Sequence, residues 1–346
     1  MSATPETKAE TFHETDVVII GAGPVGLFGV FQCGMLGLKT HVVDALDMIG
    51  GQCQALYPEK PIYDIPAWPK ITGEELILQL KKQSLPFEPT YHLGQQVVGV
   101  TKIDSGWKVE TSKQTVIHCK TIMIAAGAGA FGPNRPPLAG LEEYEDKSVF
   151  YYVRRREDFA NKHIVIAGGG DSAVDWAVSL AELAAKIYVI HRRDDFRAAP
   201  DSVEKMRALA AAGKIEMVIP YQLAALQGEN GILRQVVVKT LKGEERVLEA
   251  NILLPFFGLA TNLGPIADWG LEIHKHQVTV NPSTQQTNQP GIYVIGDMSH
   301  YDGKLKLILQ GFSEAAVAAH AAYKHIHPDK VLELTHSTDK GVPIVP

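Results

Sequence analysis

The residues with the clearest chemical role are three glycines in the segment GAGPVG, namely Gly21, Gly23 and Gly26. They follow a predicted strand at 16–20 and lie at the start of a predicted helix at about 24–37. Glycines at this spacing between a strand and a helix let the backbone turn sharply and approach a pyrophosphate, whose charge lies at the helix N-terminus. The segment therefore predicts a dinucleotide-binding loop within a βαβ unit.

An acidic residue follows at the place where such a loop needs one. Asp44 ends the next predicted strand, at 40–43, eighteen residues after Gly26. A carboxylate there accepts hydrogen bonds from the ribose hydroxyls of an adenosine and repels a 2′-phosphate. A glycine turn with a purely structural role is the alternative, but strand, turn, helix and acid occur in the order that nucleotide binding requires.

A second loop of the same kind, GGGDSA, follows the apolar run HIVIA and precedes a predicted helix at about 171–185. The residues after its next strand are basic rather than acidic, since KIYVI is followed by HRRDDFR. Arginine binds phosphate through paired hydrogen bonds, worth about 1.5–3 kcal/mol per charge-assisted contact. The pattern predicts NADPH rather than NADH, with a solvated basic strand end as the alternative. The residues assigned to this nucleotide are Gly168, Gly170, Asp171, Ser172, Ala173, His191, Arg192, Arg193 and Arg197.

A third signal is Asp297, which ends the apolar run GIYVIGD at 291–297 and precedes a predicted helix at about 310–325. A carboxylate there suits a hydrogen bond to a ribityl hydroxyl of a flavin. A nicotinamide dinucleotide has no ribityl chain, so the motif assigns FAD to the loop that begins at Gly21 and NADP(H) to the loop that begins at Gly168. Two such cofactors predict an oxidoreductase in which the flavin carries the chemistry and the protein supplies orientation and electrostatics.

The elements that must hold these loops follow from periodicity and from helix-start signals. Two helices carry a capping pattern at their N-terminus, Thr72-x-x-Glu75 and Asp201-x-x-Glu204. Alternating or continuous apolar runs predict further strands in the first half of the chain. These runs lie at 96–103, 107–111, 115–118 and 121–127.

Prolines and glycines mark two places where the chain crosses between domains, FGPNRPP at 131–137 and LLPFFGLATNLGP at 253–265. We predict an α/β fold with two Rossmann-like, three-layer nucleotide-binding domains, the NADPH domain being inserted into the FAD domain. The predicted FAD domain comprises 1–130 and 255–346, including a C-terminal tail, and the predicted NADPH domain comprises 131–254. The stiff crossings are expected to act as hinges for rotation of the NADPH domain.

Composition excludes several other classes of protein. The chain has 346 residues, enough for about two domains, and a net charge of −6, which argues against nucleic-acid binding through bulk positive charge. Its three cysteines form no CxxC pair and no Cys/His cluster, so we predict no metal site. The first fifteen residues contain no apolar segment, so a cytoplasmic location is expected. The uncharged stretch at 17–38 is long enough to span a bilayer, but its six glycines favour a strand, a turn and a helix.

Over nearly its whole length the chain resembles the thioredoxin-reductase-like flavoproteins, on the ordered motifs GAGPVG, AAG, GGGDSAVDWA, HRRDDFRA and GD. Within them it is most similar to the ferredoxin–NADP reductases of the second type, on GGQCQALYPEKPIYDIP and the tail motif HST. The resemblance implies that Tyr57 lies against one face of the isoalloxazine and that His336 covers the other, from a partner subunit of a homodimer. It also implies FAD contacts at Asp44, Gln52, Tyr57, Val97, Phe131, Asp297 and Thr338. One departure from the family is Ala199-Pro200, where a charged pair is expected.

The decisive difference from thioredoxin reductases is the missing cysteine pair, since the segment at 150–156 reads FYYVRRR. Electrons therefore cannot leave the flavin through a local dithiol and must go to an outside acceptor. The resemblance implies hydride transfer between NADPH and FAD, coupled to one-electron exchange with ferredoxin or flavodoxin, and no catalytic acid, base or nucleophile. The alternatives are an NADPH-dependent reductase of an external disulfide and a nucleotide-sensing module without catalysis.

Several other residues favour a structural role. Arg154–Arg156, Lys304 and Lys306 are expected on a solvated face, with docking of an acidic ferredoxin as the alternative. Cys53 lies close to the predicted flavin loop but is expected to pack as a small apolar side chain rather than to act as a nucleophile.

Overall fold

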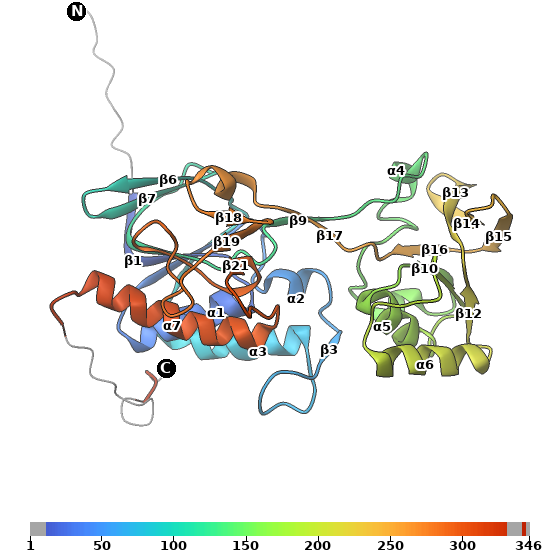
Figure 1. Ribbon diagram of the computed structural model, residues 1–346, viewed down its shortest axis with the longest axis horizontal. Helices are drawn as coiled ribbons and strands as arrows, with labels where there is room; N and C mark the ends of the chain where they lie inside the picture. The colour runs from blue at the N-terminus through green and yellow to red at the C-terminus, as the bar shows by residue number, and fades with distance from the viewer. Residues whose placement is uncertain (1–11, 331–340, 344–346) are drawn as a thin grey trace, which may run out of the picture. The chain divides into compact units, whose positions relative to one another are not determined.

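The computed structural model describes residues 12–330 and 341–343 (Figure 1). Among these, it describes all side chains except those of 130–132 and 259–261. The uncharged stretch at 17–38 forms the end of a strand, a glycine turn and a helix rather than one long helix. Of the helices in the described part of the chain, none has the length and apolar character needed to cross a membrane.

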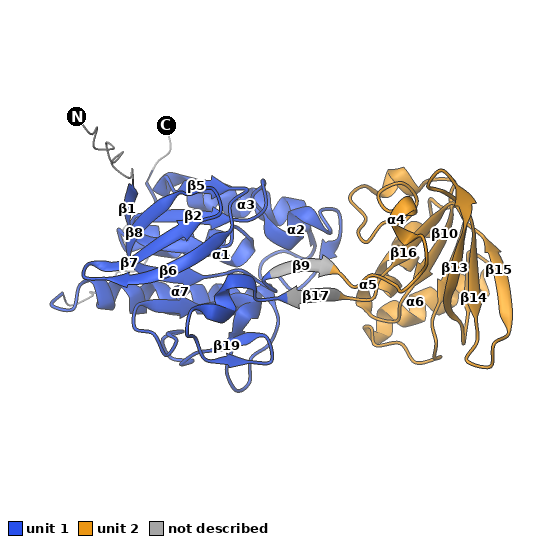
Figure 2. Ribbon diagram, turned by 90° about the horizontal axis from the view of Figure 1, so that it is seen from above, with its two compact units in different colours: residues 1–130, 261–346 blue, residues 131–260 orange. Residues whose placement is uncertain are grey.

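The chain divides into two compact units, which Figure 2 distinguishes by colour. Unit 1 is formed by residues 1–130 together with 261–346, and unit 2 by residues 131–260. The predicted return at 254/255 is therefore about six residues too early. It falls inside strand β16 (Ile252–Pro255), which pairs in parallel with a strand of unit 2 and so belongs to that unit.

A mainly parallel sheet forms the centre of unit 1. Its strands are β1 (Phe12–Ile20), β2 (Thr40–Asp44), β5 (Thr90–Leu93), β6 (Val97–Ile103), β7 (Gly106–Thr111), β8 (Val116–Ile124) and β20 (Ile292–Val294). The order is β5-β2-β1-β8-β7-β6, and β20 pairs with the second half of β8. The predicted runs at 115–118 and 121–127 are one strand, because β8 continues from its pairing with β7 into its pairing with β20.

Alternate residues of β1 point to opposite faces of this sheet, which gives the unit its layers. Val17 and Ile19 are fully buried in a cluster with residues of helices α1 (Pro24–Met35) and α7 (Ile308–Ile326). These two helices pack side by side on that face (Figure 1). Val18 is fully buried on the other face, among side chains of β7 and β8. The sheet is thus covered on both sides, as a parallel sheet requires.

Helix α3 (Gly73–Ser84) begins where the sequence predicts it. The Glu75 N–H donates to Thr72 Oγ1 at 3.2 Å, and the Thr72 N–H donates to the Glu75 carboxylate at 2.8 Å. The predicted capping box is therefore confirmed. Leu76 and Leu80 are buried one turn apart on the face that packs against the rest of unit 1.

Short elements complete unit 1 and the two crossings. Strands β18, β19 and β21 form one small sheet, and β3 pairs with β4 and β9 with β17 in two others. The bounds are α2 (Gly51–Ala55), β3 (Pro61–Ile62), β4 (Ile71–Thr72), η1 (Leu85–Phe87), β9 (Ala130–Pro133), β17 (Leu259–Asn262), η3 (Gly264–Asp268), β18 (Ile273–His274), β19 (Gln277–Thr279), η4 (Gly296–Met298) and β21 (Ser299–His300), where η denotes a 3₁₀ helix.

Unit 2 contains a second parallel sheet and an antiparallel sheet. Its elements are α4 (Leu141–Tyr144), η2 (Arg156–Phe159), β10 (His163–Ala167), α5 (Asp171–Leu180), β11 (Lys186–Ile190), α6 (Pro200–Ala211), β12 (Ile215–Val218), β13 (Gln222–Glu229), β14 (Ile232–Lys239), β15 (Glu245–Glu249) and β16. The parallel order is β12-β11-β10-β16, and β13-β14-β15 form the antiparallel sheet. The βαβ pattern predicted around the second glycine loop is thus present as β10, α5 and β11.

Two helix predictions in unit 2 are corrected by the structure. Helix α5 ends at Leu180 instead of continuing to 185, because the Leu183 N–H closes a turn onto the Leu180 carbonyl. Helix α6 begins at Pro200, whose fixed φ suits the first helical position. Asp201 therefore lies inside the helix and forms an ion pair with Lys205 at 2.6 Å instead of capping it.

Candidate functional site

The glycine loop of unit 1 lies at the carboxyl end of β1, and close packing requires two of its glycines. Gly21 has φ +112°, and a Cβ there would lie 2.4 Å from the carbonyl oxygen of Ala125. A Cβ on Gly26 would lie 1.9 Å from the carbonyl oxygen of Gly21. A Cβ on Gly23, by contrast, would meet nothing nearer than the Cα of Gly51, at 4.0 Å. The space over Gly23, at the N-terminus of α1, is open, as a pyrophosphate requires.

Asp44 ends β2 beside this loop, where the sequence predicts a ribose-binding acid. Its Oδ2 accepts a hydrogen bond from the Ala22 N–H at 2.6 Å, and its Oδ1 accepts one from the Leu46 N–H at 2.8 Å. Burial raises the pKa of Asp44, and the two backbone donors oppose that effect. Because each carboxylate oxygen has a second lone pair, Asp44 can hold the loop and still accept a hydrogen bond from a ribose hydroxyl.

Three further residues predicted to contact FAD lie together at the same edge of the sheet, namely Gln52, Tyr57 and Asp297. The Cys53 Sγ lies 3.8 Å from the Tyr57 hydroxyl. Burial raises the pKa of both groups, that of Cys53 to about 11, and the negative charge of Asp297 raises both further. The Gln52 amide lies 3.6 Å from the place where a Cβ on Gly127 would stand, just after β8. The structure therefore brings Gln52, Tyr57 and Asp297 to the carboxyl ends of the parallel strands, where such sheets bind nucleotides.

Of the other predicted flavin contacts, one lies in the core of unit 1 and the rest lie outside the described residues or side chains. Val97 is 4% exposed and packs in the core, so little of its surface is open to a ligand. The Phe131 side chain is not among those described, and His336 and Thr338 lie outside the described residues.

Sequence reasoning missed Glu314, which lies on α7 and is 2% exposed. Its Oε2 accepts a hydrogen bond from the Gly296 N–H at 2.7 Å, directly before Asp297. Its other oxygen forms an ion pair with Lys304, whose side chain is 5% exposed. The expectation that Lys304 lies on a solvated face is therefore wrong. The one signal in the sequence was a single acidic residue in an alanine-rich helix.

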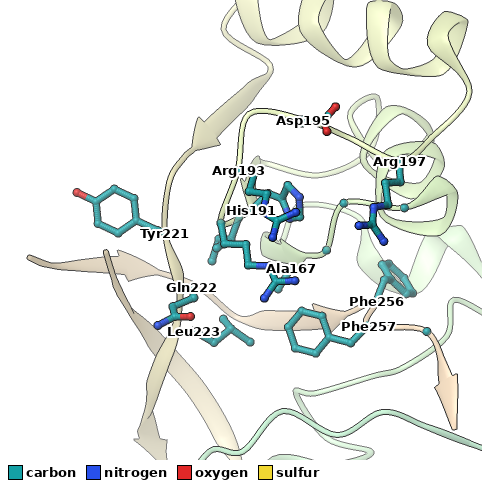
Figure 3. A pocket seen from close by; sticks show the side chains of 16 residues that line it. Ala167, His191, Arg193, Asp195, Arg197, Tyr221, Gln222, Leu223, Phe256 and Phe257 are labelled. Carbon is teal, nitrogen blue, oxygen red and sulfur yellow. The ribbon is translucent and has the colours of Figure 1, made fainter. Parts of the chain in front are cut away.

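A pocket of about 560 Å³ lies within unit 2 at the carboxyl ends of β10, β11 and β16 (Figure 3). In Figure 3, His191, Arg193 and Arg197 come from the loop after β11, whereas Phe256 and Phe257 come from the segment after β16. The sequence did not point to the two phenylalanines. The pocket is lined by Ala167, Gly168, Gly169, Gly170, Ile190, His191, Arg192, Arg193, Asp195, Arg197, Tyr221, Gln222, Leu223, Phe256, Phe257 and Gly258.

The charge around this pocket suits a phosphate. Arg192, Arg193 and Arg197 all line it, and within the described part of the chain their guanidinium groups form no ion pair. Burial lowers the pKa of His191, a hydrogen bond to the Asp195 backbone opposes this, and the charges of Arg192 and Arg193 lower the pKa further. Three arginines around one pocket, against the single carboxylate of Asp195, favour an anionic ligand.

The second glycine loop positions these arginines. A Cβ on Gly169 would lie 2.4 Å from the His191 ring, so the imidazole packs directly on the loop backbone. The backbone N–H of Arg197 donates a hydrogen bond to the backbone carbonyl of Gly169 at 2.7 Å. The Asp171 carboxylate accepts a hydrogen bond from the Ala199 N–H at 2.9 Å, which ties the arginine segment to the start of α5.

The remaining assigned residues of this loop lie around the start of α5. Gly170 is its N-cap, and a Cβ there would meet nothing nearer than the Arg197 carbonyl oxygen at 4.0 Å. Ser172 is exposed in the first turn. Ala173 is fully buried. A Cβ on Gly168 would lie 3.0 Å from the Cβ of Ala173, so the absence of a side chain at Gly168 lets helix α5 pack closely against the loop.

The basic run at 154–156 does not form a single free patch. The Arg154 guanidinium lies 4.9 Å from the centre of the Tyr152 ring. Arg155 forms an ion pair with Asp158 at 3.3 Å. The Arg156 guanidinium donates a hydrogen bond to the Ser179 carbonyl at 2.6 Å. This side chain is therefore directed towards another part of unit 2.

The three cysteines are buried and form no disulfide. Burial raises the pKa of Cys33 and of Cys119 to about 12, so their thiols stay protonated near neutral pH. Cys53 is 1% exposed within an apolar cluster, in agreement with a packing role. Among the described residues, no three His, Cys, Asp or Glu side chains are arranged to hold a metal ion.

Two glycine loops on parallel sheets, one followed by an acid and the other by arginines, define a two-domain, nucleotide-dependent flavoprotein oxidoreductase. The chain belongs to the pyridine nucleotide-disulphide oxidoreductase family, which it matches over residues 15–322. It is 60% identical to the ferredoxin–NADP reductase of Rickettsia felis, over 95% of this chain and 98% of that one. It is 57% identical to the ferredoxin–NADP reductase of Paramagnetospirillum magneticum, over 96% of this chain and 98% of that one.

A solved thioredoxin reductase from Lactococcus lactis is 26% identical and superposes with a TM-score of 0.78, covering 91% of this chain and 99% of that one. The predicted fold class and the predicted family resemblance are both confirmed by these comparisons.

Proposed function

We propose that the protein is a ferredoxin–NADP(+) reductase that binds FAD in unit 1 and NADP(H) in unit 2. One observation carries the assignment of the two cofactors. After the first glycine loop the next strand ends in Asp44, whereas after the second it is followed by Arg192 and Arg193 at the edge of a pocket. An acid suits a free ribose, and guanidinium groups suit a 2′-phosphate. The relatives named ferredoxin–NADP reductase support the same assignment.

In unit 2, the residues divide into two groups. The backbone of Gly168 and Gly170, with Asp171, Ser172 and Ala173 at the start of α5, receives the pyrophosphate at the helix N-terminus. His191, Arg192, Arg193 and Arg197 surround the 2′-phosphate.

In unit 1, Gly21, Gly23 and Gly26 receive the pyrophosphate of FAD, and Asp44 receives the adenosine ribose. Asp297 accepts a hydrogen bond from the ribityl chain, and Gln52, Tyr57 and Val97 lie along the rest of the cofactor. FAD, when bound, supplies the exchange between hydride from NADPH and single electrons for the partner. The residues of this chain hold and orient the two nucleotides, and none of them has to act as acid, base or nucleophile.

The proposed partner is ferredoxin, with flavodoxin as a second one-electron acceptor. The buried cysteines support direct transfer to an outside protein, because protonated thiols without a disulfide partner provide no redox relay. The protein is further proposed to work as a cytoplasmic homodimer. In that dimer, His336 of the tail would cover the flavin of the partner subunit. Thr338 and Phe131 are proposed as further FAD contacts.

The test is anaerobic reduction of the yellow protein by NADPH, followed by mixing with oxidised ferredoxin, flavodoxin and a thioredoxin-type disulfide. Reoxidation by ferredoxin or flavodoxin, with little by the disulfide, is the expected result. Reoxidation by the disulfide alone would replace the proposal with a disulfide reductase, the activity of the solved relative from Lactococcus lactis. A purified protein without flavin would contradict the proposal as a whole.

A further inference from the structure

A buried ion pair lies directly behind the turn that carries Asp297. Glu314 on α7 is 2% exposed, and the side chain of its partner Lys304 is 5% exposed. Charged groups are rarely buried to this degree unless they are paired and hydrogen-bonded. The predicted nucleotide contacts include neither residue, so the pair needs a separate explanation.

The two oxygens of Glu314 make different contacts. Oε2 accepts a hydrogen bond from the Gly296 N–H at 2.7 Å. The Ser299 hydroxyl lies 3.3 Å from the same oxygen and 2.9 Å from the Gly296 carbonyl, so its single proton can serve either one. Oε1 accepts hydrogen bonds from Lys304 and, at 2.5 Å, from the Tyr301 hydroxyl. One oxygen therefore holds the turn and the other holds the counterion.

This contact fixes the position of the η4 turn. Gly296 has φ +73°, and a Cβ on it would lie within 3.6 Å of the Val25 side chain at the start of α1. The next residue is Asp297, whose charge raises the pKa of Cys53 and Tyr57. Glu314 thus anchors a backbone segment that lies between the glycine loop and the residues proposed to contact the flavin.

We propose that Glu314 and Lys304 are a positioning pair for the flavin. Glu314 holds the Gly296–Asp297 turn in place, and Lys304 neutralises the carboxylate so that the flavin does not experience an unpaired buried charge. This inference rests on the proposed binding of FAD in unit 1. It assigns no catalytic step to either residue.

The proposed pairing predicts the direction in which the flavin reduction potential shifts when one of the two charges is removed. A merely structural role predicts no such direction. Reduction adds electrons to the flavin, so a nearby unpaired anion disfavours it and a nearby unpaired cation favours it. Lys304→Met leaves Glu314 unpaired and lowers the flavin reduction potential. Glu314→Gln leaves Lys304 unpaired and raises it, while the amide oxygen still accepts from Gly296. The double variant contains neither charge and returns towards the wild-type potential.

The experiment measures the flavin potential of the purified holoproteins by dye-linked titration and the FAD dissociation constant by fluorescence. Lys306→Met is the matched control, because Lys306 is exposed two residues away. Glu314→Ala removes the acceptor for the Gly296 N–H and is expected to weaken FAD binding about tenfold or more, the effect of losing a hydrogen bond to a charged group. Lys304→Arg keeps the charge and is expected to keep the wild-type potential.

The outcomes separate this inference from the proposed function. Shifts of opposite sign for the two single variants, with recovery in the double variant, support the pair. Equal potentials in all flavin-containing variants, or shifts of the same sign, overturn it while the function stands. If a single charge variant does not fold, Tyr301→Phe removes one donor from Glu314 without changing charge. It is expected to lower the potential slightly, and an unchanged potential contradicts the proposal. A wild-type protein without FAD overturns the function itself.

Discussion

The Asp44 carboxylate lies 2.6 Å from the backbone nitrogen of Ala22 and accepts its hydrogen. This contact joins the end of β2 to the middle of the glycine loop, 22 residues earlier in the chain. The acid that the sequence assigns to a ribose therefore also shapes the loop that is proposed to receive the pyrophosphate. We therefore expect both nucleotide binding and local stability to depend on this side chain.

Replacing Asp44 tests that double role. In Asp44→Asn the amide presents a donor to either Ala22 or Leu46, so one backbone N–H loses its acceptor. We expect the free energy of unfolding of the flavin-free protein to fall by about 1–3 kcal/mol. Urea denaturation measures this change. Asp47→Asn, at an exposed position on the same segment, is the control and should leave the unfolding free energy nearly unchanged.

Two glycine replacements in the same loop are expected to fail in different ways. Gly23→Ala places a methyl group in open space, so the flavin-free protein should unfold at the wild-type temperature but bind FAD poorly, because the methyl group occupies the path of the pyrophosphate. Gly26→Ala places a methyl group 1.9 Å from the Gly21 carbonyl oxygen and should prevent correct folding. Thermal unfolding and flavin fluorescence distinguish these results. Wild-type FAD affinity in Gly23→Ala would refute the assigned position of the pyrophosphate.

The arginines of unit 2 predict the choice between NADPH and NADH. Arg192→Ala and Arg193→Ala should each raise the KM for NADPH about tenfold to a hundredfold and leave the KM for NADH nearly unchanged, since NADH has no 2′-phosphate. Steady-state reduction of an artificial dye measures both constants. Arg234→Ala is the control, because Arg234 is exposed on β14 and is not among the residues that line the pocket. Equal losses with both nucleotides would indicate damage to the fold instead of lost phosphate contacts.

A group of three histidines on β1, β2 and β5 predicts a pH effect on stability. Burial, then the nearby His92 and His13, lower the pKa of His41 to about 4, and the His41 and His92 rings share a hydrogen bond at 3.0 Å. An unfolded histidine titrates near 6.5, so between these values the unfolded state binds more protons. The stability contributed by neutral His41 is therefore complete above pH 6.5 and is lost as pH falls towards 4.

The measurement is the unfolding temperature of wild type and His41→Asn between pH 8 and pH 4.5. At pH 8 the variant should be less stable, because it loses the bond to His92. The difference should shrink or reverse at low pH, by a modest amount since His41 is partly exposed and solvent screens its charge. His276→Asn, at an exposed position, should show the wild-type pH dependence. Parallel pH curves for wild type and His41→Asn would contradict the assignment.

Features that depend on a few neighbouring residues were predictable from the chain alone. The glycine loops, the Thr72–Glu75 capping box and the arginine segment after β11 are defined by backbone geometry and by contacts within one or two turns. The expected capping role of Asp201 was wrong even at this range. Pro200 already meets the needs of the helix start, so a local pattern with two solutions was not decisive.

Contacts between distant elements required the tertiary structure. Glu314 meets Gly296 because α7 packs against the end of β20, and Lys304 is buried because the loop before α7 folds back over that carboxylate. Phe256 and Phe257 line the pocket of unit 2 because β16 returns beside β10. No periodicity or spacing encodes these meetings, since they depend on strand register and helix packing. The sequence therefore predicted which chemical groups the two candidate sites contain. The partners of these groups and their burial were determined by how the layers pack.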